Sequence, residues 1–245
     1  MLSGFYTAAS GILTQQRNLS VVSNNMANSQ TVGFKSDRLV TSTFDHTLMT
    51  RIERGTRTHI GTTSPISTVD DIVTNLESAG YKSTERPFDM AISGEGYFNI
   101  MGLERQYMTR NGNFNIDQEG YLVLEGIGRV LGENGAVNVG GSDFTVDYDG
   151  SVYDGNMNYI DRLLVTVPDE GVELQKYNNG LFSSNQVQIV GNATVFQKLL
   201  ERSNTDMNEE YTRLMEAQKA FTACSNALQI MDTMNSRATA IAMVS

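Results

Sequence analysis

Apolar residues recur at alternating three- and four-residue steps near both ends of the chain, whereas the middle shows short runs between glycine-marked turns. Near the start, this spacing is carried by Leu2, Phe5, Ala9, Ile12, Gln16, Leu19, Ser23 and Met26. Near the end, it is carried by Tyr211, Leu214, Gln218, Phe221, Ser225 and Leu228. Such steps place side chains on one face of an α-helix. The pattern predicts a long helix at each end, and the two helices are expected to pack together as a coiled-coil-like pair.

Two glycines, Gly4 and Gly11, lie seven residues apart and therefore share one face of the first predicted helix. Their missing side chains would let a second backbone approach closely, although a fraying helix start also tolerates glycine. The sequence leaves both explanations open. Because the apolar stripes are thin and include Gln16 and Gln218, neither helix is expected to be stable without a partner.

The middle of the chain is typical of antiparallel β structure. Runs such as Tyr97–Met101 and Gln106–Thr109 alternate with turn pairs such as Asn111-Gly112. This spacing predicts a compact antiparallel all-β domain, barrel-like or sandwich-like, and so an α+β protein overall. The segment Thr194–Arg202 fits a short helix or a strand, and Asp206 followed by a Glu three residues later predicts the start of the final helix.

These patterns divide the chain into four expected segments. They are an N-terminal assembly helix with its motif in residues 1–35, an extended Ser/Thr-rich linker with short strands in residues 36–84, the β domain in residues 85–193, and a return segment with the C-terminal assembly helix in residues 194–245.

The net charge of -10 is concentrated in the middle of the chain. Residues 85–175 contain sixteen Asp or Glu and five Arg, a local charge of 5 − 16 = −11, so the remainder sums to +1. The acidic middle is either a solvated β surface or an outward-facing assembly surface. A nucleic-acid partner is disfavoured by the sign of the charge, and no apolar run is long enough to predict membrane insertion.

Residues that could carry chemistry are sparse. The only cysteine is Cys224, in the final helix pattern, and the only histidines are His46 and His59, so no Cys-His constellation is predicted. The Asp and Asn residues from Asp147 to Asp161 suggest calcium, but they fit turns better because the spacing of an EF-hand is not kept. We predict no catalytic, cofactor-binding or metal-binding residue and no cofactor. The rival is a secreted carbohydrate-active β protein that uses carboxylate catalysis.

One string after the first helix has a specific pattern: Asn, an apolar residue, Ala and Asn, followed by Thr-x-Gly-aromatic-basic. Its residues are Asn25, Ala27, Asn28, Thr31, Gly33, Phe34 and Lys35. This string resembles the signature of the flagellar basal-body rod and hook family. Three further stretches, residues 86–100, 107–124 and 201–221, resemble the same family and extend the similarity nearly end to end.

The resemblance implies a structural subunit of the bacterial flagellar basal-body rod, located in the cell envelope and without enzymatic activity. A hook-type axial protein of the same family is the alternative. Implied partners are copies of the chain, other rod and hook subunits, and the flagellar type III export apparatus. On this basis we expect the terminal helices of neighbouring subunits to interdigitate and transmit torque. The expected assembly interface consists of Phe5, Ile12, Leu19, Met26, Tyr211, Leu214, Phe221 and Leu228.

Overall fold

The fold comes from a computed structural model in which the chain divides into two compact units, each taken by itself below. The structure describes residues 2–44, 47–53, 56–63, 66–103, 105–169, 171–172, 174–177, 180–184, 186–190 and 193–244. The helix unit comprises Met1–Ala27, Asp37–Asn75 and Asp206–Ser245, and the β unit comprises Asn28–Ser36 and Leu76–Thr205.

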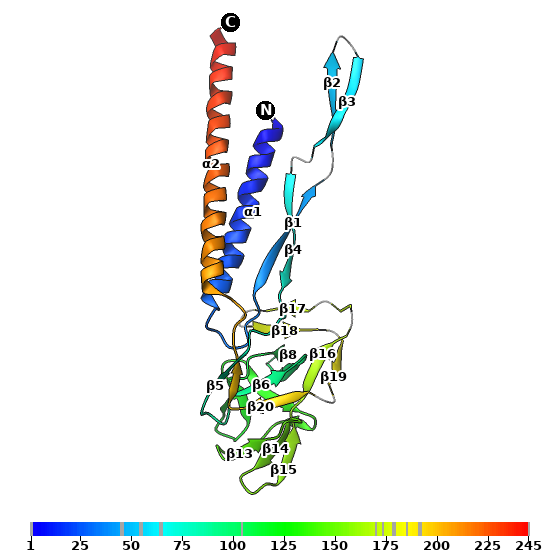
Figure 1. The fold of residues 1–245 in the computed structure, drawn as a ribbon, viewed down its shortest axis with the longest axis vertical. Coiled ribbons are helices and arrows are strands. Elements are labelled where there is room, and N and C mark those ends of the chain that lie inside the picture. Colours follow the sequence, from blue (N-terminus) through cyan, green and yellow to red (C-terminus); the bar gives the residue numbers. More distant parts are fainter. Residues whose placement is uncertain are drawn as a thin grey trace. The chain divides into compact units, whose positions relative to one another are not determined.

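The helix unit consists of two helices and a β ribbon. Helix α1 (Leu2–Ala27) and helix α2 (Met207–Val244) run side by side in opposite directions (Figure 1), so the predicted pairing of the two ends of the chain is confirmed. Helix α1 also contacts strands β1 (Asp37–Phe44) and β4 (Ile66–Thr74). It therefore lies between α2 and the ribbon.

The ribbon is made from the Ser/Thr-rich segment. Strands β1 and β4 pair antiparallel from Asp37 opposite Thr74 to Phe44 opposite Ile66, with an irregularity after Val40. Strands β2 (Thr47–Glu53) and β3 (Thr56–Thr63) form a second antiparallel pair. Alternating β-branched residues favour such strands. The segment expected to be an extended linker with short strands thus contains two long pairs.

Helix α2 starts where the sequence predicts. The Asp206 carboxylate accepts a hydrogen bond from the backbone N–H of Asn208 at 2.8 Å, which satisfies one of the unpaired donors at the first turn. Glu209 does not complete a capping box, because its carboxylate pairs with Arg213 one turn later.

The β unit contains the remaining described strands, and every strand pair among them is antiparallel (Figure 1). Its largest sheet has the order β17-β18-β8-β7-β11-β10-β9, with β16 on β7, β19 on β16 and β12 on β11; β13-β14-β15, β20-β6 and β21-β5 form smaller sheets. The strands are β5 (Tyr81–Ser83), β6 (Met90–Ser93), β7 (Tyr97–Met101), β8 (Gln106–Thr109), β9 (Asn115–Ile116), β10 (Leu122–Leu124), β11 (Gly128–Gly132), β12 (Gly135–Ala136), β13 (Phe144–Val146), β14 (Ser151–Asp154), β15 (Tyr159–Arg162), β16 (Val165–Pro168), β17 (Gln175–Lys176), β18 (Leu181–Ser183), β19 (Val187–Ile189), β20 (Thr194–Gln197) and β21 (Leu199–Glu201).

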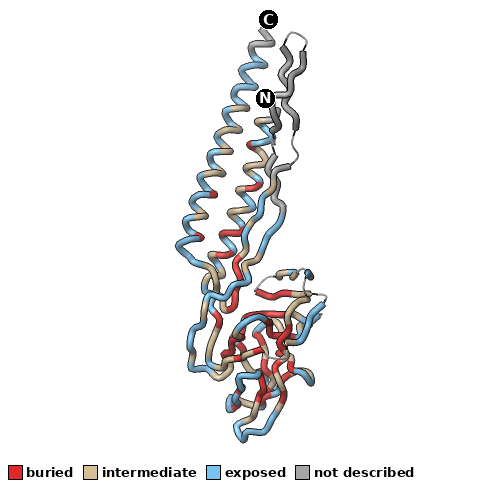
Figure 2. Tube along the Cα trace, turned by 45° about the vertical axis from the view of Figure 1, so that its right-hand side comes forward, coloured by how far each residue is buried: buried red, intermediate tan, exposed pale blue. Residues whose placement is uncertain are grey.

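Two expectations about this unit are settled by its topology. The segment Thr194–Arg202 forms strands β20 and β21 and not a helix. Among the described strands the sheets remain open, so the antiparallel β middle is confirmed but a closed barrel is not. The buried residues concentrate in this unit (Figure 2), where Phe98, Ile100, Phe114 and Leu122 are each 0% exposed.

Candidate functional site: the helix pair and the motif loop

The seam between α1 and α2 is built from small residues. A Cβ placed on Gly4 would lie 3.0 Å from Met231 Cε, and one placed on Gly11 would lie 3.0 Å from Cys224 Sγ. The step of seven residues from Gly4 to Gly11 is thus matched by seven residues back along α2, which is one heptad of an antiparallel register. The two glycines therefore allow α1 and α2 to approach closely, which is the first of the two explanations that the sequence allowed.

A buried asparagine fixes the other end of the seam. The Asn25 amide Nδ2 donates to Glu210 Oε2 at 3.4 Å, two heptads beyond Gly11 and two heptads before Cys224 in α2. The same amide donates to the Asp37 carbonyl at 2.8 Å, and Asn25 Oδ1 accepts from the Asp37 N–H at 3.0 Å. Arg213 holds the Glu210 carboxylate from the other side at 3.0 Å. The motif residue Asn25 therefore joins the end of α1, the start of α2 and the first strand of the ribbon.

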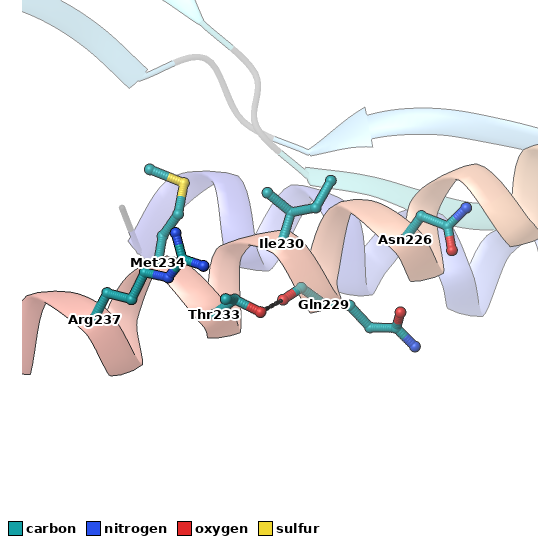
Figure 3. Close-up of a pocket in the computed structure, with 6 residues that line it drawn as sticks. All are labelled: Asn226, Gln229, Ile230, Thr233, Met234 and Arg237. Atoms are coloured by element: carbon teal, nitrogen blue, oxygen red, sulfur yellow. Dashed lines mark hydrogen bonds between the residues drawn. The ribbon is translucent and has the colours of Figure 1, made fainter.

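The large apolar residues of the two helices are only partly covered in the single chain. Of the expected assembly residues, Phe5 and Tyr211 are exposed, by 43% and 55%. The other six are half-buried: Ile12, Leu19, Met26, Leu214, Phe221 and Leu228. Apolar residues that the expectation did not include are also exposed on the same helices: Tyr6, Leu13, Met207, Met215, Ile230 and Met234, the last two of which are drawn in Figure 3. The helix pair thus presents a broad apolar surface to its surroundings.

The motif continues as a tight loop in the β unit. Ala27 is the last residue of α1, and it is exposed. The Thr31 hydroxyl donates to Asn28 Oδ1 at 3.1 Å, and the Thr31 N–H donates to the Asn28 carbonyl at 3.1 Å. Gly33 then takes a left-handed conformation with φ of 67°, and a Cβ at this position would lie 2.4 Å from the backbone carbonyl of Arg110. Only glycine fits this turn without displacing the backbone that it touches.

Phe34 and Lys35 anchor the loop. Phe34 is 2% exposed, and Lys176 Nζ lies 4.3 Å from its ring centroid. The Lys35 ammonium is buried and donates to Glu201 Oε1 at 2.7 Å and to the Glu77 carbonyl at 3.0 Å. Burial lowers the pKa of Lys35, and the hydrogen bond to Glu201 opposes that shift. The basic residue of the motif is therefore an internal ion-pair partner and not a surface charge.

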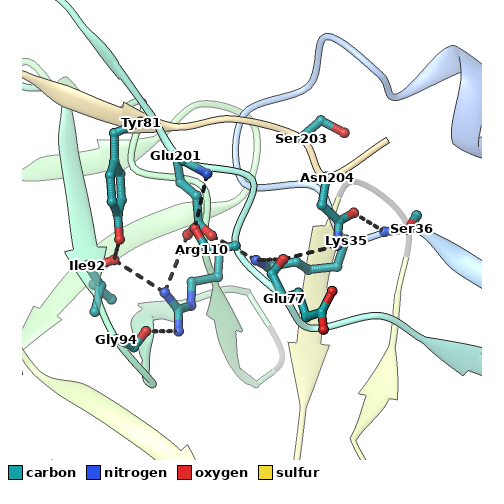
Figure 4. Close-up of polar contacts among 12 residues, drawn as sticks. Lys35, Ser36, Glu77, Tyr81, Ile92, Gly94, Arg110, Glu201, Ser203 and Asn204 are labelled. Atoms are coloured by element: carbon teal, nitrogen blue, oxygen red, sulfur yellow. Dashed lines mark hydrogen bonds and ion pairs between the residues drawn. The ribbon is translucent and has the colours of Figure 1, made fainter. Parts of the chain in front are cut away.

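A second cation shares the same carboxylate, as Figure 4 shows. Arg110 Nη1 lies 3.3 Å from Glu201 Oε2 and donates to the Ile92 carbonyl at 3.3 Å, while Nη2 donates to the Gly94 carbonyl at 2.6 Å. The side chains of Lys35, Arg110 and Glu201 are 2%, 7% and 0% exposed. We call these three residues the buried ion triad. Removing its single anion would leave two buried cations without a counter-charge.

The backbone around the triad is tied by further polar contacts (Figure 4). The Gly33 N–H donates to the Glu201 carbonyl at 2.9 Å. The Ser36 N–H donates to Asn204 Oδ1 at 2.7 Å, and Asn204 Nδ2 donates to the Glu77 carbonyl at 3.1 Å. Within the β unit, these bonds hold the segment that leaves α1 beside the segment that leads to α2.

The partners of the motif, Arg110, Glu201, Asn204 and Glu210, could not be predicted from the sequence. Glu201 lies 166 residues from Lys35 and 91 from Arg110. A charged residue in a strand pattern is ordinarily read as a solvent-facing position. Strand β21 consists of only three residues, Leu199–Glu201, and its short pattern does not single out Glu201 as a buried position.

No chemistry beyond packing emerges from the described residues. Among them, no three His, Cys, Asp or Glu side chains gather as a metal site requires. The Asp149 and Asp154 carboxylates accept backbone N–H groups of their own turns instead of a cation. Neither described helix is long and apolar enough to cross a membrane. His46 lies outside the described residues, as does the side chain of His59.

Two terminal helices that pack through small residues and leave large apolar residues exposed, joined to an antiparallel β unit, are typical of a structural protein. Comparison with known proteins identifies the family. Three family models match, described as "Flagella basal body rod protein" over residues 5–35, "Flagellar hook protein FlgE/F/G D1 domain" over residues 91–189, and "Flagellar basal body rod FlgEFG protein C-terminal" over residues 197–241.

Whole-length relatives agree with these models. The chain is 30% identical to the flagellar basal-body rod protein FlgG of Bacillus subtilis, over 95% of this chain and 96% of the relative. It is 29% identical to the rod protein FlgF of Caulobacter vibrioides, over 90% of each chain, and 27% identical to the hook-basal body complex protein FlhO of B. subtilis, over 95% of each. The chain belongs to the flagellar basal-body rod protein family, whose members are structural components of the basal body and are not known as enzymes.

Proposed function

We propose that this rod subunit polymerises axially through its two terminal helices and transmits torque along the polymer. The observation that carries the proposal is the broad apolar surface of the helix pair in the single chain, with Leu13 67% and Tyr211 55% exposed. Such side chains are costly to leave in water and mark contact surfaces when they gather on one element. Membership of the rod family supports the same assignment.

Within this proposal the expected assembly residues keep their role as contacts between subunits. Phe5 and Tyr211 are the first residues to test, because they are the two of the set that are exposed in the single chain. Full burial of an apolar side chain of this size contributes about 1.5–3 kcal/mol. Several such contacts must form together to offset the entropy of ordering both helices. Assembly and the final ordering of the helix ends are therefore coupled.

The partners proposed for these contacts are copies of the chain and other rod and hook subunits. Family membership supports them, because rod and hook proteins share the matched models. Delivery through the flagellar type III export apparatus is part of the same proposal. In this proposal the helices α1 and α2, which lie within segments 1–35 and 194–245, would make the contacts.

The test compares one double substitution in the helix unit with one single substitution in the β unit, each of which removes exposed apolar surface. Phe5→Ser combined with Tyr211→Ser should abolish polymer formation by the purified protein and motility in a strain that depends on it. Leu103→Ser is the matched control, because Leu103 is fully exposed in the β unit, at the turn between β7 and β8. Electron microscopy and soft-agar swimming provide the readouts. Normal polymers from the double variant would rule out assembly through the helices.

A further inference from the structure

The first and last strands of the β unit pair with each other. Strand β5 pairs with β21, and β6 pairs with β20. The motif loop joins them, because the Gly33 N–H donates to the Glu201 carbonyl at 2.9 Å. Gln197 Nε2 donates to the Pro87 carbonyl at 2.8 Å, across 110 residues of sequence. We call these strand pairs and loop contacts the closing seam, since they join residues from opposite ends of the unit's sequence.

The centre of the β unit is built from neighbouring segments instead. Strands β7 and β8 pair with each other within residues 97–109, and β10 pairs with both β9 and β11 within residues 115–129. Closing a short loop costs less conformational entropy than closing a long one, so contacts between neighbouring segments form early in folding. The closing seam is therefore expected to form after these central strands.

The buried ion triad lies in the closing seam (Figure 4). Lys35 comes from the motif loop, Glu201 from the end of β21, and Arg110 from the position that follows β8. An ion pair that is open to water contributes little to stability, whereas a pair enclosed by protein cannot lose its anion without leaving buried charge behind. While the seam is open, the pairs are hydrated and weak. Their full contribution is gained only when the seam closes around them.

We propose that the buried ion triad gives the β unit kinetic stability: it forms after the central strands and must break before the closing seam can open. Opening the seam separates Glu201 from both Lys35 and Arg110. An interaction that is absent from the folding transition state slows unfolding without accelerating folding. Resistance to forced unfolding is governed by the unfolding rate. The inference concerns the single chain and does not depend on assembly through the helices.

Unfolding and refolding rates of the full-length chain test this order. They are measured by rapid mixing with denaturant and by tyrosine fluorescence, which reports mainly on the β unit because every tyrosine except Tyr6 and Tyr211 lies there. Glu201→Gln should raise the unfolding rate by about 100-fold or more and change the refolding rate by less than about twofold. Leu122→Ala is the matched contrast in the core strand β10 and should slow refolding.

Two further variants separate the charges from the shape of the site. Lys35→Met added to Glu201→Gln removes one of the two unpaired cations, and the introduced amide oxygen can still accept from Arg110. The unfolding rate of this double variant should be about tenfold lower than that of Glu201→Gln alone. Arg110→Lys keeps the charge but cannot reach Glu201 and the Ile92 and Gly94 carbonyls at once. It should unfold faster and refold at the normal rate, so it provides the test if Glu201→Gln does not fold.

Slower refolding of the Glu201→Gln chain with an unchanged unfolding rate would place the triad in the folding nucleus and overturn the proposal. Unchanged rates in both directions would overturn it too, because the triad would then not hold the closing seam. If the double variant unfolds as fast as Glu201→Gln alone, unpaired charge is not the cause. Normal refolding of Leu122→Ala would contradict the early formation of the central strands. Failure of the unsubstituted chain to polymerise would count against the proposed function and leave this inference unchanged.

Discussion

The two units of this protein bury their apolar residues to very different extents. The β unit encloses a continuous core that includes Phe98, Phe114 and Leu122, all 0% exposed. In the helix unit, the described residues that are both buried and apolar are Ala8, Val21, Val22 and Ala217. Three of its aromatic residues, Phe5, Tyr6 and Tyr211, stay exposed. The β unit therefore covers its apolar residues within the single chain, whereas the helix unit leaves large apolar side chains exposed, as the proposed assembly through the helices requires.

The largest effect is expected from removing the anion of the buried ion triad. Glu201→Gln leaves Lys35 and Arg110 without a counter-charge, and breaking a buried pair in this way costs about 3–5 kcal/mol. Chemical denaturation followed by tyrosine fluorescence should show this loss in the β unit. Glu119→Gln is the control, because Glu119 pairs with Arg129 on the surface and is 68% exposed, and little change is expected. Equal stability of the two variants would show that the buried ion triad does not stabilise the β unit.

A backbone substitution should give the next largest effect. Gly33→Ala places a methyl group 2.4 Å from the Arg110 carbonyl carbon, in addition to the strain of a left-handed alanine, which alone costs about 1–2 kcal/mol. Gly126→Ala separates the backbone strain from the steric contact with Arg110, since Gly126 has φ of 75° but open space around it. The thermal midpoint should fall clearly further for Gly33→Ala. Equal shifts would mean that the close contact does not constrain the loop.

Hydrogen exchange compares the two units directly. In a dilute monomer, backbone amides in residues 5–25 of α1 should exchange at least about tenfold faster than those of β7 and β10, a difference of about 1.4 kcal/mol. The reason is the small apolar area that holds α1 in the single chain. In the polymer the α1 amides should become protected. Strong protection of residues 5–25 in the monomer would show that the helix unit is complete by itself.

The sequence was informative where a pattern is periodic and local. Spacing alone predicted both helices, the β-rich middle and the Asp206 cap. It did not reveal which helix face forms the seam within the chain, because that seam uses Gly4, Gly11 and Ala217, whereas apolar spacing is read from large residues. Gly33 was recognised as a turn, but its contact with Arg110 depends on the packed fold.

The buried ion triad could not be predicted from the sequence, for a different reason. Its members are far apart along the chain, and each is of a residue type that is usually solvated. Only the fold shows that Lys35, read as the basic end of a family motif, is enclosed beside Glu201. Long-range polar pairing leaves no periodic trace, so a single sequence cannot report it.

The smallest expected effect is the response of the β unit to acid. Hydrogen bonds from backbone and side-chain donors hold the pKa of Asp149 and of Asp154 below the ordinary Asp value. At Asp117, desolvation is the largest single influence and raises the pKa, but backbone hydrogen bonds and Arg129 together outweigh it and lower the pKa. For a carboxyl whose pKa is lowered by folding, the stabilisation is fully present above its unfolded pKa of about 3.9 and disappears as the pH falls through the folded value. The β unit should therefore lose stability below about pH 4.

The matched variant carries Asp117→Asn, Asp149→Asn and Asp154→Asn together. An asparagine can still accept the backbone hydrogen bonds of each turn, but it does not titrate. Denaturation midpoints measured between pH 6 and pH 2.5 should depend less on pH in this variant than in the unsubstituted chain. If both chains respond identically to acid, the turn carboxylates of the β unit are not what makes it sensitive.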